Sequence, residues 1–210
     1  MKNLAIIGAG HLGQQIAYHV TKDKQFNVVG FFDDFAESET TVSGFKILGK
    51  IDTIKTLFNT NIFDKIIIGV GYKHFNFREI LYQKLINIVP LATFVHSSCY
   101  VDASCSIGHG VFMFPGSVLD QNVSIEDNVI INVNSTIAHD TKIGMHTFLS
   151  PRVAIAGFVK IGESCNIGIN ATIINNINIT DKVRLGGGTV VINNIEMPGL
   201  YVGNPSKFVR

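Results

Sequence analysis

Residues 137–168 read IAHDTKIGMHTFLSPRVAIAGFVKIGESCNIG, and every sixth residue from Ile137 onward is isoleucine or leucine. The same spacing continues in both directions. From Val95 to Val191, all seventeen residues at intervals of six are aliphatic. They are Val95, Val101, Ile107, Met113, Leu119, Ile125, Ile131, Ile137, Ile143, Leu149, Ile155, Ile161, Ile167, Ile173, Ile179, Leu185 and Val191. A strict period of six is too long for a helix and too short for a hairpin meander.

A second series lies two residues before the first, and nearly all of its members are small or β-branched. It comprises Thr93, Cys99, Cys105, Val111, Ser117, Val123, Val129, Ser135, Thr141, Thr147, Val153, Val159, Cys165, Ala171, Ile177, Val183 and Thr189. Because alternate residues of a strand share a face, each pair describes the inward side of a short strand, with a corner following it. The pattern predicts a parallel β-solenoid with three sides per coil, and seventeen strands make about five and a half coils.

The three cysteines, Cys99, Cys105 and Cys165, all fall in the small inward series. They are odd in number and lack CxxC spacing, so the sequence suggests neither a disulfide framework nor a zinc site. We predict that all three are buried core thiols.

The first ninety residues have a different pattern, in which buried strands alternate with helices. We expect strands at Leu4–Ile7, Asn27–Phe32 and Lys65–Val70, and helices from His11 to about Lys22 and from His74 to Asn87. Alternation of this kind is typical of a parallel sheet. The chain is therefore predicted to have an α/β domain at residues 1–90 and a β-helix at 91–210.

Glycines after the first predicted strand match the GxGxxG pattern, with Gly8, Gly10 and Gly13, and Asp33 follows Gly13 by twenty residues. This is the context of a dinucleotide fingerprint and points to NAD. Ninety residues, however, suffice only for one mononucleotide half of a Rossmann fold. A nucleotide-sugar diphosphate would fit the same cradle, because the helix N-terminus offers amide donors and a positive dipole. A tight turn without a ligand is the third possibility.

Composition narrows the class of partner. Lys and Arg number 17 and Asp and Glu 16, giving a net charge of +1, which argues against a nucleic-acid or anionic-membrane footprint. No apolar run approaches the ~18 residues of a membrane span, and no cleavage pattern follows the apolar start. We expect a cytoplasmic protein with a small-molecule substrate.

The repeat resembles that of the hexapeptide acyltransferases, as in Ile143-Gly144, Ile161-Gly162, Ile167-Gly168 and Leu185-Gly186. Together with the N-terminal half-Rossmann pattern, it resembles the sugar N- and O-acyltransferase branch. That branch includes the bacillosamine-pathway enzymes, the perosamine and Qui4N N-acetyltransferases and the sialic acid O-acetyltransferases. The resemblance implies a left-handed β-helix, a homotrimer, an acetyl-CoA site between neighbouring subunits and a nucleotide sugar held by the N-terminal domain. No loop interrupts the repeat to build an acceptor site.

Residues of the N-terminal domain are assigned by that resemblance. It implies that Gly10, His11 and Leu12 line the diphosphate, that Asp33 and Asp34 meet the nucleoside, and that Gly69 closes the pocket.

Acetyl transfer needs a base for the nucleophile and a donor for the oxyanion. His139 lies at a mid-helix corner and is followed by Asp140, which could hold its tautomer. The family has a histidine with an acidic neighbour here, although the preceding residue, often acidic in relatives, is Ala138. The other corner or outward histidines, His96, His109 and His146, are expected to be solvated, and His19 and His74 lie in predicted helices. Two other interpretations of His139 remain: a solvated corner histidine, and a metal ligand, for which the sequence shows no partner ligand.

Gly157 follows His139 by eighteen residues, one coil further at the same corner, and its amide is the predicted donor to the oxyanion or to the thioester of acetyl-CoA. The family match places Ile169, Asn170 and Gly187 along the CoA groove. The ending Gly203-Asn204-Pro205-Ser206-Lys207 resembles the family's G-x-P-x-K, which implies that Lys207 lies near CoA phosphates. Asn132 is a candidate acceptor contact.

The resemblance implies direct attack by the amine of a UDP- or dTDP-linked 4-amino-4,6-dideoxy sugar on acetyl-CoA. Three alternatives remain: a sugar O-acetyltransferase of the sialic acid type, an NAD-binding or redox-sensing module, and a structural trimer without catalysis.

Overall fold

The computed structural model describes residues 1–37 and 40–210. The chain divides into two compact units, Met1–Phe94 and Val95–Arg210, where the sequence predicted a boundary after residue 90. Leu91 and Ala92 stay with the first unit because Leu91 bridges to Ile66 and the Ala92 N–H donates to the Ile66 carbonyl.

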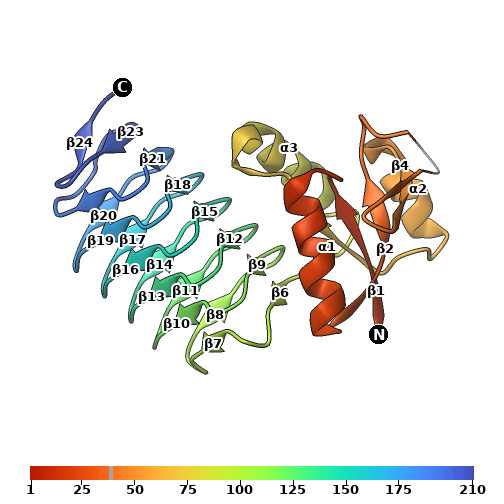
Figure 1. Cartoon of the computed structure of the whole chain (residues 1–210), viewed down its shortest axis with the longest axis horizontal. Coiled ribbons are helices and arrows are strands. Elements are labelled where there is room, and N and C mark those ends of the chain that lie inside the picture. The colour runs from red at the N-terminus through yellow and green to blue at the C-terminus, as the bar shows by residue number, and fades with distance from the viewer. Residues whose placement is uncertain (38–39) are drawn as a thin grey trace. The chain divides into compact units, whose positions relative to one another are not determined.

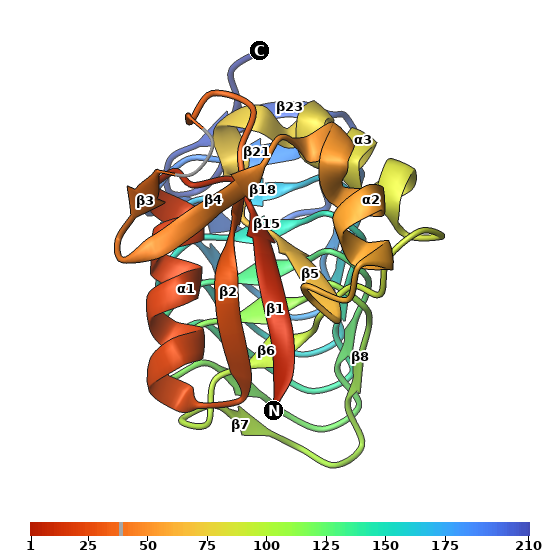
Figure 2. The same ribbon diagram turned by 90° about the vertical axis from the view of Figure 1, so that its right-hand side faces the viewer.

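The first unit is built on a five-stranded sheet in the order β3-β4-β2-β1-β5. Its strands are β1 (Lys2–Ile7), β2 (Phe26–Phe32), β3 (Thr41–Val42), β4 (Phe45–Gly49) and β5 (Lys65–Ile68). Figure 2 shows β1 between β2 and β5, and all three run parallel, as predicted.

The expectation of a purely parallel sheet was wrong at one edge, because β3 pairs antiparallel with β4. The chain reverses there at Ser43 and Gly44, whose φ angles of 50° and 84° suit the tight turns of β-hairpins. The sequence prediction contained neither strand.

Three α-helices complete this unit: α1 (His11–Asp23), α2 (Ile54–Asn59) and α3 (Phe75–Leu85), with 3₁₀ turns η1 (Ile51–Thr53) and η2 (Tyr72–His74). Helix α1 buries Ile16, Ala17 and Val20 against β1 and β2. It ends at Lys24, whose left-handed conformation caps it through a bond to the Val20 carbonyl. Within the described part of the chain, no helix is long and apolar enough to cross a membrane.

The second unit is a left-handed parallel β-helix of seventeen successive strands, β6 to β22 (Figure 1). Each strand ends at one member of the predicted aliphatic series, so the predicted repeat is confirmed in phase and in number. The strands are β6 (Phe94–Val95), β7 (Tyr100–Val101), β8 (Ser106–Ile107), β9 (Phe112–Met113), β10 (Val118–Leu119), β11 (Ser124–Ile125), β12 (Ile130–Ile131), β13 (Thr136–Ile137), β14 (Lys142–Ile143), β15 (Phe148–Leu149), β16 (Ala154–Ile155), β17 (Lys160–Ile161), β18 (Asn166–Ile167), β19 (Thr172–Ile173), β20 (Asn178–Ile179), β21 (Val183–Leu185) and β22 (Val190–Val191).

These strands form three flat faces. The first face has the order β22-β19-β16-β13-β10-β7, the second β20-β17-β14-β11-β8, and the third β21-β18-β15-β12-β9-β6. The third face is extended by β23 (Gly199–Val202), parallel to β21, and by β24 (Lys207–Phe208), antiparallel to β23. Strands pair with those one coil away, as Leu119 pairs with Ile137 and Ile137 with Ile155.

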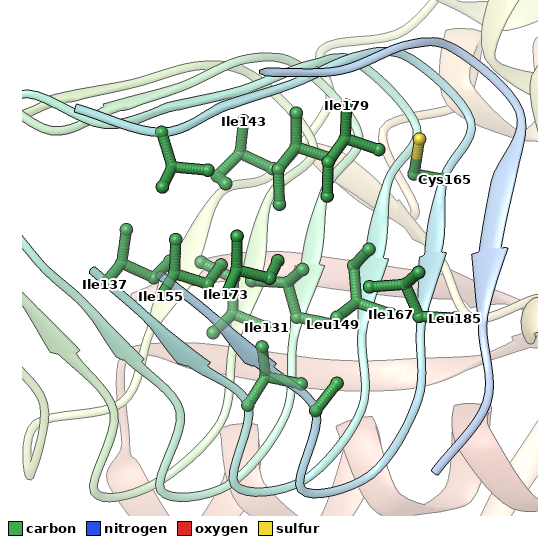
Figure 3. Packing of buried hydrophobic residues seen from close by; sticks show 14 of the residues in the cluster. Ile131, Ile137, Ile143, Leu149, Ile155, Cys165, Ile167, Ile173, Ile179 and Leu185 are labelled. Atoms are coloured by element: carbon green, nitrogen blue, oxygen red, sulfur yellow. The ribbon is translucent and has the colours of Figure 1, made fainter. Parts of the chain in front are cut away.

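The aliphatic series forms the core of the β-helix (Figure 3). Ile137, Ile155 and Ile173 stack along the first face with exposures of 0%, 3% and 1%. Burial of each such side chain contributes about 1.5–3 kcal/mol. The stack buries one continuous core along the axis, which accounts for the stability of strands only two residues long.

The prediction of three buried thiols was correct only for Cys165, which is fully buried. Cys99 and Cys105 are half-buried and pack against the edge of the core. They belong to the first coil, where no preceding coil of the β-helix stacks over them.

The corners repeat as regularly as the strands. One residue per corner has a positive φ, and these residues follow one another at intervals of six from Gly110 to Gly188. The non-glycine members are Asn122, Asn128, Asn134, Asp140, His146, Arg152, Phe158, Ser164, Asn170, Asn176 and Lys182, with φ between 54° and 63°. Glycine, asparagine and aspartate adopt this left-handed conformation most readily, so the corners explain much of the asparagine in the repeat.

Candidate active site

The corner between the first and second faces carries the predicted base, and we call it the His139 corner. His139 Nδ1 lies 3.0 Å from Asp140 Oδ2, and Asn122, one coil earlier, donates from Nδ2 to Asp140 Oδ1 at 3.1 Å. The hydrogen bonds from His139 and Asn122 hold the pKa of Asp140 below its usual range. The charged carboxylate favours a proton on Nδ1, a tautomer assigned from the hydrogen bonds, and leaves Nε2 as the acceptor.

Gly157 lies against the imidazole of His139. A Cβ atom added to Gly157 would come within 2.6 Å of both Cε1 and Nε2 of the ring, so only glycine allows this packing. Gly157 is buried, and its N–H has no hydrogen-bond partner among residues 1–37 and 40–210. At the same position of another corner, the His109 and Glu163 amides are capped by aspartate side chains, at 2.7 and 2.8 Å. The Gly157 amide is therefore a donor placed beside the predicted base.

Phe158 is the third neighbour of His139 and was missed in the sequence. The two rings meet edge to face, with centroids 5.0 Å apart and an interplanar angle of 87°. The sequence spacing could have predicted this contact, since Phe158 follows His139 by one coil and one residue.

The residues assigned to CoA lie at a different corner, between the third and first faces. The Gly188 N–H donates to the Ile169 carbonyl at 2.8 Å, and a Cβ on Gly187 would lie 3.1 Å from Ile169 Cγ2. The structure thus brings together Ile169, Asn170 and Gly187, with the Ile169 side chain 49% exposed. Lys207 is an exposed residue of β24.

Asn132 also lies at this second corner, directly after β12, and not at the His139 corner. Its side chain donates from Nδ2 to the Leu149 carbonyl at 3.1 Å. Within one chain, the predicted base and the predicted CoA residues therefore stand at opposite edges of the first face.

The prediction of a solvated His146 was wrong. The residue is 5% exposed, and its Nδ1 lies 2.9 Å from Nδ2 of the buried Asn128 one coil earlier. Stacking on Asn128 at a corner encloses the ring. His109, in contrast, is exposed, as expected.

The glycines of the GxGxxG loop have two different roles in the first unit. A Cβ on Gly13 would lie 1.8 Å from the Gly8 carbonyl oxygen, and one on Gly69 would lie 2.9 Å from Gly13 Cα. These glycines allow α1, β1 and β5 to approach closely. At Gly10 an added Cβ would meet nothing within 4 Å. Gly10 and His11 are exposed at the N-terminus of α1, where an anion is favoured.

The two predicted acidic residues follow β2 and are hydrogen-bonded to backbone amides. Asp33 Oδ2 accepts from the Ala9 N–H at 2.7 Å, and Oδ1 accepts from Phe35 N–H at 2.8 Å. Asp34 Oδ1 accepts from the Ile51 N–H at 2.9 Å. Asp33 therefore ties the end of β2 to the glycine-rich loop. Among the described residues, no group of three or more His, Cys, Asp or Glu side chains is arranged to hold a metal ion.

Comparisons with known proteins agree with this architecture. Residues 3–85 match the family model described as the PglD N-terminal domain. The chain superposes on PerB from Caulobacter crescentus, solved with CoA and GDP-perosamine, with a TM-score of 0.92 and 24% identity over 100% of this chain and 98% of that one. It matches the acetyltransferase domain of PglB from Neisseria gonorrhoeae with a TM-score of 0.91 and 26% identity over 100% of both chains. WeeI from Acinetobacter baumannii gives 0.86 and 23%, again over 100% of both.

No curated protein sequence matches the chain. Residues 3–85 are similar to the PglD N-terminal domain, and the chain as a whole has the fold of PerB and of the PglB acetyltransferase domain.

Proposed function

We propose that this protein is an acetyl-CoA-dependent N-acetyltransferase whose acceptor is a UDP- or dTDP-linked 4-amino-4,6-dideoxy sugar. The observation that carries the proposal is the arrangement of His139 between the charged Asp140 and the amide of Gly157, whose N–H has no hydrogen-bond partner in the described part of the chain. The likeness to the gonococcal acetyltransferase domain, which has also been solved with acetyl coenzyme A, supports the class of reaction.

The chemistry follows from the two polar groups beside the ring. Acetyl-CoA supplies the thioester that the sugar amine attacks. Nε2 of His139 accepts the proton of the amine, and Asp140 stabilises the imidazolium that results. The Gly157 N–H donates to the oxyanion that forms at the thioester carbonyl. Collapse of this intermediate breaks the C–S bond and releases CoA, whose sulfur takes the proton from His139. A general base is worth roughly 10²- to 10⁴-fold in rate, and one oxyanion donor roughly 10²- to 10³-fold.

The separation of the two corners supports a site shared between copies of the chain. The outward row of the first face is uncharged, whereas the second face carries Lys142 and Lys160. The members of this uncharged row are Tyr100, Val118, Thr136, Ala154, Thr172 and Val190. We propose that three copies pack through the first face. The His139 corner of one copy then faces Ile169, Asn170, Gly187 and Lys207 of the next, which bind acetyl-CoA.

The N-terminal domain is proposed to hold the nucleotide sugar. The open space at Gly10 and the position of the exposed His11 and the half-buried Leu12 in the first turn of α1 suit a diphosphate. Asp33 and Asp34 would orient the nucleoside and Gly69 would close the pocket, while Asn132 would contact the acceptor sugar. PerB was solved with a GDP-linked sugar, so the carrier nucleotide needs a direct test. We place the reaction in the cytoplasm.

The test uses a panel of UDP-, dTDP- and GDP-linked 4-amino-4,6-dideoxy sugars with acetyl-CoA, and follows thiol release. We expect turnover of a UDP or dTDP sugar and a loss of about 10²-fold or more in kcat for His139→Ala. His109→Ala is the matched control, because His109 occupies the same position of another corner and is exposed. It should leave the rate unchanged.

Turnover of sialic acid in place of every amino sugar would favour O-acetylation. A His139→Ala enzyme at near-full rate would refute the base, and saturable NAD binding without acetyl-CoA binding would favour the dinucleotide alternative. A chain that binds neither acetyl-CoA nor NAD would favour the structural trimer.

A further inference from the structure

Phe158 interrupts a column of residues suited to the left-handed backbone at the His139 corner. The positive-φ positions of this corner are Asn122, Asp140, Phe158 and Asn176, one in each successive coil. Asparagine and aspartate tolerate this conformation, whereas a bulky side chain at φ 59° is strained. Asn122 also hydrogen-bonds to Asp140, so an asparagine at 158 would extend an existing ladder. Folding alone favours asparagine at this position.

Burial does not explain the phenylalanine either, because Phe158 is 53% exposed. Its defined contact is the edge-to-face approach to His139, at 5.0 Å between centroids. Aromatic pairs prefer this edge-to-face geometry, so the contact favours one orientation of the imidazole ring. His139 is thus bounded by Asp140 at Nδ1, by Gly157 against Cε1 and Nε2, and by the ring of Phe158.

We propose that Phe158 is a positioning residue that holds the His139 imidazole in the orientation needed for proton transfer, at a cost in the stability of the corner. The inference rests on the proposed function for its kinetic consequence. Its structural part, the restraint on the ring, can be measured without any substrate.

The first experiment measures stability. Phe158→Asn and Phe158→Gly relieve the left-handed strain and should raise the melting temperature of the full chain by about 2–4 °C. Lys182→Asn and Lys182→Gly are matched controls, because Lys182 has φ 56° at the same position of another corner and is exposed. They should give a similar rise. A fall in melting temperature on replacing Phe158, beside a rise for Lys182, would show that Phe158 is structural and overturn the proposal.

The second experiment measures the ring itself by NMR of histidine-labelled protein. We expect both Phe158 variants to broaden or shift the His139 ring signals and to weaken the preference for a proton on Nδ1. The Lys182 variants should leave those signals unchanged. Unaltered His139 signals in both Phe158 variants would overturn the proposal, whether or not the protein acetylates a sugar. Absence of acetyl transfer by the wild type would instead refute the proposed function alone.

Kinetics then separates positioning from other roles. Phe158→Asn and Phe158→Gly should lower kcat by about 10-fold or more, with the KM for acetyl-CoA within about twofold. Phe158→Tyr keeps the ring edge and should restore most of the rate. The asparagine variant adds a side chain that can hydrogen-bond to Asp140 and so disturb the site by itself. The loss of kcat is therefore attributed to the missing phenyl ring only if the glycine variant shows it too. A changed oligomeric state with parallel changes in KM would assign Phe158 to a subunit contact and overturn the positioning role. An unchanged kcat would also overturn it.

Discussion

The α-carbon of Gly157 lies against the imidazole of His139, with room for a hydrogen but not for a methyl group. We therefore predict that Gly157→Ala displaces the ring and not the backbone. The added Cβ would meet Cε1 and Nε2 at 2.6 Å, and a side chain that is 41% exposed can move aside at little cost in stability. We expect kcat to fall by about 10²-fold with a change in unfolding free energy below about 1 kcal/mol. Steady-state kinetics and urea unfolding measure the two, and an unchanged kcat would contradict the assignment.

Asp140 fixes which nitrogen of His139 carries the proton, and Asp140→Asn tests this. The amide is nearly isosteric and suits the φ of 56°, so the fold should persist. It can donate to Nδ1, however, and this would move the ring proton to Nε2, where the base must be free. Because the pair is 41% and 36% exposed, water softens the effect, and we expect a loss of about 10- to 100-fold in kcat. Wild-type kinetics in this variant would show that Asp140 does not act on the base.

The period of six was enough to predict the β-helix, because every strand of every coil places one aliphatic side chain in the core. Every strand from β6 to β22 therefore ends where the sequence places it. The antiparallel β3 and the terminal strand β24 were not predicted. Both lie outside the six-residue repeat, so no periodicity marks them, and their pairing depends on turns.

The candidate site was only partly visible in the sequence. His139, Asp140 and Gly157 followed from the phase of the repeat and from family resemblance. Asn122 and Phe158 were missed, although residues eighteen or nineteen positions away necessarily stack on the same corner. The burial of His146 was also missed, because phase alone does not show how corner side chains stack on one another.

Two glycines of one loop should respond differently to alanine. Gly13→Ala places a methyl group 1.8 Å from the backbone carbonyl of Gly8, which cannot move aside, so we expect a loss of about 2–4 kcal/mol in unfolding free energy of the N-terminal domain. Gly10→Ala meets nothing within 4 Å at an ordinary φ of −69° and should leave stability unchanged. If Gly10 borders the diphosphate, the same variant should weaken nucleotide-sugar binding by calorimetry. Equal stability losses would contradict the distinction.

Cys165 should make stability depend on pH in the alkaline range. Burial raises the pKa of this thiol from 9.0 to about 12, because the core disfavours the thiolate. The neutral thiol therefore stabilises the fold fully below pH 9, and the contribution is lost progressively as pH rises from 9 toward 12. Urea unfolding of the wild type and of Cys165→Ala at pH 7 and pH 10 measures this. The difference between the two proteins should shrink at pH 10.

In thiol labelling at pH 8, Cys99 and Cys105 should react before Cys165, since they are half-buried and Cys165 is enclosed. Rapid labelling of Cys165 in the native protein would show that the core opens far more readily than its packing implies.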